Sequence, residues 1–149
     1  MTKGLLSAAT FIAAVFTMIT ALPATSHAED QDVIDYRQHI MKAMDAQTAA
    51  VGKILSFAIP ENQLPSHLER IAVMAGSALK SHEEEVHGGE SLPTIWKNWD
   101  DFYTKMKDFE TKMIAVAEKA REGGREAIMG DIVLALSCKS CHDLYREKK

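Results

Sequence analysis

Apolar residues recur at alternating spacings of three and four along most of the chain after residue 28. This is the period of an amphipathic helix, and no alternating pattern typical of a strand persists. Glycine and proline interrupt the pattern at three places: residues 60–65, 88–93 and 123–124. The interruptions divide the chain into four segments, each long enough for a helix.

The third segment has the clearest apolar stripe. Its members share one helix face at heptad-like spacing: Ile95, Trp99, Phe102, Met106, Phe109, Met113, Val116 and Ala120. The other segments carry similar stripes, and that of the first includes two polar residues, Arg37 and Thr48. Four such helices joined by short loops predict an all-α protein, an antiparallel up-down-up-down four-helix bundle.

This topology brings distant parts of the chain to one end of the bundle. The start of the first helix, the end of the second, the start of the third and the end of the fourth meet there. The longest connection, roughly residues 83–93, falls at the same end. We therefore expect residues 34–44, 75–86 and 93–102 to surround the last helical turns of the chain.

The first 28 residues have the layout of a secretory signal peptide. A basic residue precedes an apolar run over residues 5–22, and Ser26 and Ala28 provide small side chains at the cleavage positions. The alternative is an uncleaved membrane anchor, since the run is almost long enough to span a bilayer. We expect cleavage after Ala28, which leaves residues 29–149 as one exported, periplasmic domain.

The charge balance narrows the choice of partners. The chain has 17 basic and 21 acidic residues, and the first 28 residues contribute one lysine and no acid. The mature domain is therefore acidic, which argues against a nucleic-acid partner. No second apolar run is long enough to span a membrane, so we expect no stable membrane insertion after cleavage.

The two cysteines, Cys138 and Cys141, stand directly before His142 in a C-x-x-C-H sequence. On a helix these three side chains share one broad face, so the thiols can reach two haem vinyl groups while the imidazole reaches the iron. The sequence predicts covalent attachment of one haem c, with His142 as an axial ligand. A disulfide closing so short a loop would add little stability.

Other interpretations of the cysteines fit the sequence less well. A thioredoxin-like redox pair belongs between a strand and a helix, which the pattern does not provide. A structural zinc site would need two more ligands, and only His82 and His87 fall near that end of the bundle. The export signal and the adjoining histidine both disfavour a chance match.

With C-x-x-C-H near the C-terminus of a four-helix bundle, the chain resembles the class II cytochromes c, the group that includes cytochrome c′. The resemblance covers essentially the whole mature chain and rests on residues 33–38, 92–96 and 138–149. It implies a haem at one end of the bundle, Arg37 beside the haem propionates and Arg146 near the proximal histidine. A homodimer through the outer faces of the first two helices is common in this family, and the sequence does not decide it.

Three residues of the expected haem pocket have alternative interpretations. Arg37 is core-facing and needs a partner, which a propionate would supply; alternatively, it reaches solvent at the helix end. Trp96, Trp99 and Phe102 fall at the haem end of the third helix. They could pack on the porphyrin, although core packing alone would explain Trp99 and Phe102.

The distal side of the iron decides the function within this family. Members with an open sixth position have a high-spin haem that binds nitric oxide or carbon monoxide, whereas a methionine there gives a low-spin haem suited to electron transfer. The resemblance places Met41 at the distal position, and a thioether favours ferrous iron. We predict that Met41 binds the iron and that the protein is an electron carrier serving redox partner proteins.

The alternative is a five-coordinate, gas-binding protein of the cytochrome c′ type, with an open distal site lined by Met41. Methionine is also a common core filler, and Met44 shares the same face. Neither His39, which faces away from the stripe, nor His67, at the far end, is expected on the iron. With no distal acid–base pair in view, we expect no enzymatic activity.

Overall fold

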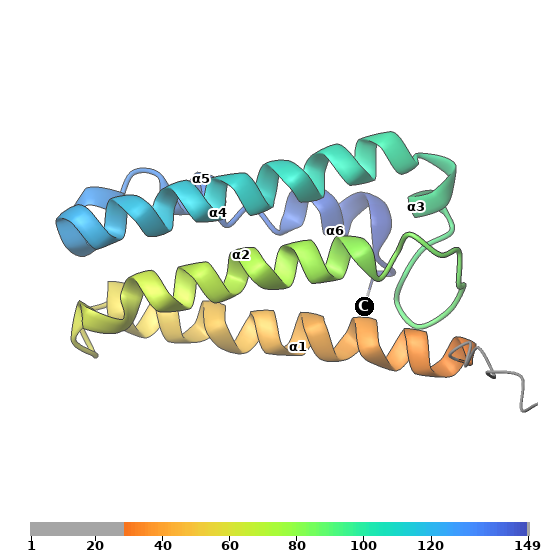
Figure 1. The fold of residues 1–149 in the computed structure, drawn as a ribbon, viewed down its shortest axis with the longest axis horizontal. Coiled ribbons are helices and arrows are strands. Elements are labelled where there is room, and N and C mark those ends of the chain that lie inside the picture. Colours follow the sequence, from red (N-terminus) through yellow and green to blue (C-terminus); the bar gives the residue numbers. More distant parts are fainter. Residues whose placement is uncertain (1–28, 149) are drawn as a thin grey trace, which may run out of the picture.

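A computed structural model describes residues 29–148, and Figure 1 shows their arrangement. Three long helices lie side by side: α1 (Asp30–Leu55), α2 (Leu64–Lys80) and α4 (Trp99–Ile128). The shorter elements are a 3-10 turn, η1 (Glu61–Gln63), and the helices α3 (Thr94–Lys97), α5 (Ile132–Ala135) and α6 (Lys139–Tyr145). Residues 29–148 contain no strand, so the all-α prediction is confirmed. The predicted signal peptide and its cleavage site lie outside the described residues.

The first two predicted breaks fall where expected. Helix α1 ends just before Phe57, which has a left-handed backbone conformation with φ 62°, and Pro60 follows. Pro65 lies in the first turn of α2, where its missing N–H would have no helical partner. The structure therefore joins α1 and α2 by a tight connection, and they pack against each other.

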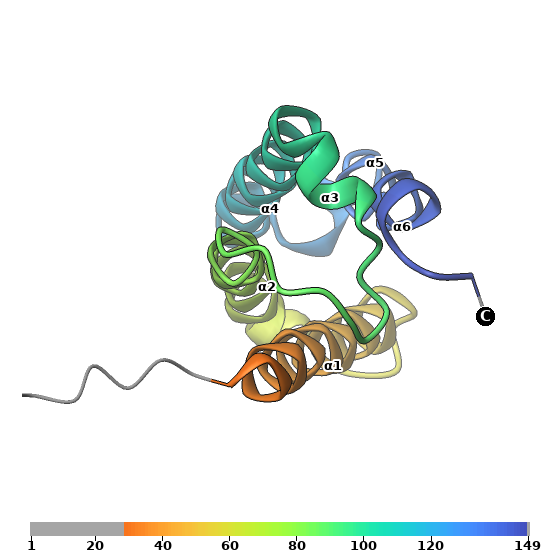
Figure 2. The same cartoon turned by 90° about the vertical axis from the view of Figure 1, so that its right-hand side faces the viewer.

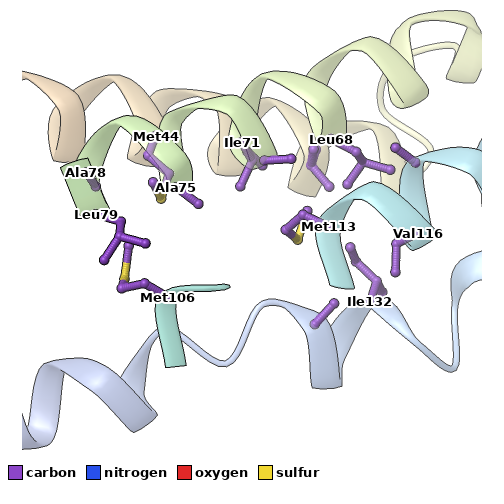
Figure 3. Packing of buried hydrophobic residues seen from close by; sticks show 14 of the residues in the cluster. Met44, Leu68, Ile71, Ala75, Ala78, Leu79, Met106, Met113, Val116 and Ile132 are labelled. Atoms are coloured by element: carbon purple, nitrogen blue, oxygen red, sulfur yellow. The ribbon is translucent and has the colours of Figure 1, made fainter. Parts of the chain in front are cut away.

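The core lies between the long helices, and α2 packs against both α1 and α4. Figure 3 shows apolar side chains from these helices and from α5 meeting in one cluster. The largest completely buried ones are Val51, Ile54, Leu64, Leu68, Ile71, Met113 and Ile128. The stripe predicted for the third segment faces this core, although Trp99 and Phe109 are only partly buried.

The fourth segment differs from the prediction of one continuous helix. The predicted break does fall at Gly124, whose φ of 67° and ψ of −159° are not helical, and a short helical stretch beyond it ends at Ile128. The fourth position of the bundle is then filled by two short helices, α5 and α6, separated by residues 136–138. The left-handed conformation of Gly124 ends the regular run of α4, and Ile128 in the short stretch beyond it is completely buried in the core.

The connection between α2 and α3, residues 81–93, is called the α2–α3 loop below. Figure 2 shows it leaving α2, passing beside α1 and rising to α3 next to α6. The α2–α3 loop therefore crosses the end of the bundle at which α6 lies. Within the described chain, no helix is both long and apolar enough to cross a membrane.

Candidate haem site

The attachment residues lie at the start of α6. Cys138 immediately precedes the helix, and its carbonyl oxygen accepts a hydrogen bond from the His142 backbone N–H at 3.1 Å. The helical spacing that the motif requires is therefore present. Both cysteines are free thiols, Cys138 exposed and Cys141 half-buried. Loss of water around each thiol raises its pKa.

His142 is the imidazole that is available to a metal. The four other described histidines are each held by a protein group: His39 by the Asp35 carbonyl, His67 by Gln47, His82 by the Ala78 carbonyl and His87 by Glu85. Among residues 29–148, no group hydrogen-bonds the His142 ring. Partial burial lowers the pKa of His142, and the charge of Arg146 lowers it further. Both effects favour the neutral imidazole that binds metals.

The neighbours of α6 agree in part with those expected from an up-down-up-down bundle. It packs on α3 and α4, where the Tyr145 hydroxyl donates to Asp101 and the Tyr145 ring lies 5.3 Å from that of Phe102. The expected proximity to residues 93–102 is thus confirmed. Helix α1 instead packs on α2, and it is linked to α6 through the α2–α3 loop, as described below.

Several side chains fit a haem at this end. Met41, Trp96, Trp99, Leu136 and Cys141 border the buried core while remaining partly exposed. They offer a porphyrin the apolar surface that its faces require. Together with two free thiols three residues apart and one available imidazole, they form a donor set that fits haem c.

Arg37 is 4% exposed, so the alternative that it reaches solvent is wrong. Its guanidinium donates to the carbonyl oxygens of Ser81 (2.8 Å), Val86 (2.5 Å) and Glu84 (2.9 Å). It also lies 5.3 Å from the centroid of a Trp96 ring. Burial lowers the pKa of Arg37, while the Glu84 charge raises it. The sequence did not predict these carbonyl partners; pairing with a propionate stays a prediction.

The other two pocket residues lie close to this cluster. Trp96 is half-buried, and its indole N–H donates to the His82 carbonyl oxygen at 2.9 Å. Arg146 follows α6 and is exposed, with its backbone bridged to that of Ser91. Its backbone N–H donates to the His142 carbonyl oxygen at 3.2 Å, and a role for its side chain in the haem pocket stays a prediction.

Sequence reasoning missed the importance of His82, which is 4% exposed. Its ring bonds the Ala78 carbonyl at 2.8 Å and the Ser91 hydroxyl at 3.3 Å. Burial lowers its pKa to about 4, the Ala78 bond opposes this shift, and the Arg37 charge adds to it. The signal was present in the pattern, because His82 continues the three-four spacing of Ala75 and Ala78 beyond the end of α2.

Known proteins resemble the chain over nearly all of this structure. The sequence profile of the family described as Cytochrome C′ matches residues 32–146. The chain belongs to the cytochrome c′ family. A cytochrome c′ from Alcaligenes xylosoxydans xylosoxydans is 25% identical over 127 residues, covering 82% of this chain and 98% of the relative.

Solved structures of cytochromes c′ show the same fold. Cytochrome c prime from Shewanella frigidimarina is 24% identical, with a TM-score of 0.73, covering 83% of this chain and 100% of that one. A nitric oxide complex of a point mutant of cytochrome c prime from Alcaligenes xylosoxidans is 25% identical, with a TM-score of 0.71 and the same coverage. The four-helix-bundle prediction is thereby confirmed.

Membership of the cytochrome c′ family settles the cofactor and corrects the function. Proteins of the family carry one covalently bound haem c, so that prediction is confirmed. The prediction of an electron carrier with a low-spin, methionine-ligated haem is wrong, because the family profile, the relative that spans nearly the whole structure and the similar solved structures are cytochromes c′ and favour the five-coordinate alternative. Helical spacing put Met41 on the same helix face as Arg37, but it cannot determine whether a flexible thioether that also fills cores reaches the iron.

Proposed function

We propose that the protein is a periplasmic cytochrome c′ that binds a small diatomic gas, nitric oxide or carbon monoxide. The observation that carries the proposal is the family match over residues 32–146, which spans both the attachment motif and helix α1. A nitric oxide complex among the structural relatives supports this choice of ligand class. The apolar run before residue 28 supports export.

In this proposal the chain holds the haem from one side only. Cys138 and Cys141 form thioethers with it, and His142 is the proximal ligand. When bound, the haem would supply an iron able to hold a small gas molecule. The available imidazole of His142, alone among the described histidines, supports a single axial histidine.

Met41 lines the distal side in this proposal without binding the iron. It is partly buried at the edge of the core, one helical turn after Arg37, whereas Met44 lies deeper and is buried. The apolar thioether of Met41 excludes water from the gas site. Because the side chain is flexible, a small ligand can push it aside and bind in its place. The pocket then selects small neutral molecules over hydrated ions.

The proposed activity is binding and not catalysis. Peroxide or hydrolytic chemistry would need a distal acid–base group, and the described histidines other than His142 are held by hydrogen bonds elsewhere. A homodimer through the outer faces of α1 and α2 is part of the proposal, supported by the resemblance alone. No redox partner is proposed.

The visible absorption spectrum of the purified holoprotein tests the proposal. We expect a high-spin spectrum in both oxidation states, with a clear shift of the reduced form on addition of carbon monoxide. A low-spin spectrum with a thioether-to-iron charge-transfer band, unmoved by the gas, would refute the proposal.

The variant Met41→Ala separates lining from ligation. If Met41 only lines the distal face, the spectrum of the variant stays high-spin and carbon monoxide binds faster because the side chain no longer has to move. Conversion from low-spin to high-spin on substitution would show that the thioether had been an iron ligand. Met74→Ala, which removes a partly buried methionine from α2 instead, is the matched control.

A further inference from the structure

We infer that Arg37 is a positioning residue that sets the distance between the helix carrying Met41 and the helix carrying His142, by fixing the α2–α3 loop between them. The inference rests on the proposed function for its gas-binding readout. Its structural part concerns contacts within the chain and can be tested separately.

The first step is the attachment of the loop to α1. The guanidinium of Arg37 reaches three loop carbonyls that point toward it from different residues, those of Ser81, Glu84 and Val86. Each carbonyl is reached by a different nitrogen, Nε, Nη1 or Nη2, whereas the three N–H donors of a lysine all leave from one nitrogen and cannot cover the same spread. The loop is therefore bound to α1 through one side chain.

The loop glycines close on the same helix. A Cβ atom at Gly88 would lie 2.6 Å from Ile34 Cδ1, and one at Gly89 would lie 2.9 Å from Ile34 Cγ2. Both glycines have positive φ angles, 128° and 63°, which side-chain-bearing residues rarely adopt. The loop backbone thus rests directly on α1, one turn before Arg37.

The second step is the attachment of the loop to α6. The Leu92 N–H donates to the Tyr145 carbonyl at 3.0 Å, and the Glu147 N–H donates to the Glu90 carbonyl at 2.9 Å. The Thr94 hydroxyl donates to the Leu144 carbonyl at 2.9 Å. These bonds fix the end of the loop and the start of α3 to the last turn of α6, directly after the haem-attachment residues.

The loop therefore connects the two helices between which the haem site lies. Helix α1 packs on α2, and α6 packs on α3 and α4, so the loop supplies a short route from one to the other, visible in Figure 2. Met41 is one helical turn after Arg37 on the same face. A shift of α1 at Arg37 consequently moves Met41 relative to His142.

Two variants of the full-length holoprotein test this in different ways. Arg37→Lys keeps the charge but loses the fork, and Gly88→Ala introduces a methyl group that presses on Ile34. The matched control is Arg125→Lys, which makes the same change at the other end of the bundle, where Arg125 donates to the Ile54 carbonyl at 2.7 Å. The readouts are hydrogen exchange at Leu92 and Glu147, the visible spectrum, and the rate of carbon monoxide binding.

We expect exchange at Leu92 and Glu147 to be about tenfold faster or more in both test variants, because charge-assisted bonds or close packing are lost. Carbon monoxide binding should speed up in parallel, with Arg125→Lys unchanged in both readouts. Unchanged exchange in Arg37→Lys would overturn the inference; if the visible spectrum changed instead, Arg37 would act on the haem itself. Faster exchange with unaltered gas binding and spectrum would also overturn it.

Failure of the proposed function gives a different pattern. A holoprotein that binds no carbon monoxide in any variant would refute gas binding. Faster exchange together with an altered spin state in Arg37→Lys and Gly88→Ala would then still support a positioning role for Arg37 toward the haem.

Discussion

The two ends of the bundle are both held by an arginine, but with different chemistry. At the haem end, Arg37 donates only to backbone carbonyls. At the opposite end, Arg125 donates to the Ile54 carbonyl and, through its backbone and side chain, to the Glu61 carboxylate. The side chain of Arg125 is 12% exposed, and its guanidinium lies 4.2 Å from the centroid of the Phe57 ring.

The comparison shows that the arginine at the haem end keeps its positive charge without a carboxylate bonded to it, whereas the arginine at the far end does not. At the far end a carboxylate accepts directly from the arginine, so the two charges largely cancel. At the haem end the acceptors are neutral, and the neighbouring His82 is held in its neutral form by burial. The Glu84 charge acts on Arg37 only from a distance, since the hydrogen bond is to its carbonyl. A buried cation beside a site for haem suits the anionic propionates, as the resemblance implies.

The largest expected effect comes from a substitution at the haem end, in the attachment motif that the opposite end lacks. Cys141→Ala should leave the haem with a single thioether or lose it, because one thiol cannot reach both vinyl groups. Haem staining after denaturing electrophoresis, with mass spectrometry, measures this. Ser140→Ala, between the same cysteines, is the control; native haem content in Cys141→Ala together with the pyridine haemochrome absorption of a haem held by two thioethers would contradict the use of Cys141.

Removal of each arginine sharpens the comparison of the two ends. Arg37→Ala leaves three carbonyls without their charged donor, and we expect the free energy of unfolding to fall by about 3 kcal/mol. Arg125→Ala should lower it by about 1 kcal/mol, mainly through the Ile54 carbonyl, because an exposed ion pair adds little. Urea unfolding of both holoproteins measures the difference. Equal losses would show that neutral and charged acceptors hold the two ends equally well.

The two ends should also respond to acid over different pH ranges. The pKa of His82 is lowered by burial from 6.5 to about 4, so its neutral form stabilises the fold fully above 6.5 and that stability is lost as the pH falls toward 4. Over this range the free energy of unfolding should decrease by about 3 kcal/mol.

At the far end, hydrogen bonds from Arg125 lower the pKa of Glu61 below 4.5, so its contribution is lost only at lower pH. Urea unfolding across this series, for the native chain and for His82→Gln, measures the haem-end effect. The variant should lack the decrease above pH 4.5; if it retains all of it, another group is responsible.

Secondary structure was largely predictable because helix periodicity is a local property. The stripe through Phe102, Met106 and Met113 correctly identified the buried face of α4. The break predicted at Gly123 and Gly124 was also correct, since the backbone of Gly124 leaves helical geometry there. The pattern failed beyond that break, where one continuous helix was expected and the chain instead forms the separate short helices α5 and α6.

By itself the sequence determined the all-helical bundle, the haem-attachment motif and the end of the molecule at which it lies. These follow from spacing along one chain and from the reach of two thiols and one imidazole. Only the tertiary structure decided the partners of Arg37 and the burial of His82. Those depend on the path of the α2–α3 loop, where carbonyls more than forty residues away in sequence are brought to one guanidinium. No residue pattern specifies such backbone acceptors, because every residue has a carbonyl and only its position in space makes it a partner.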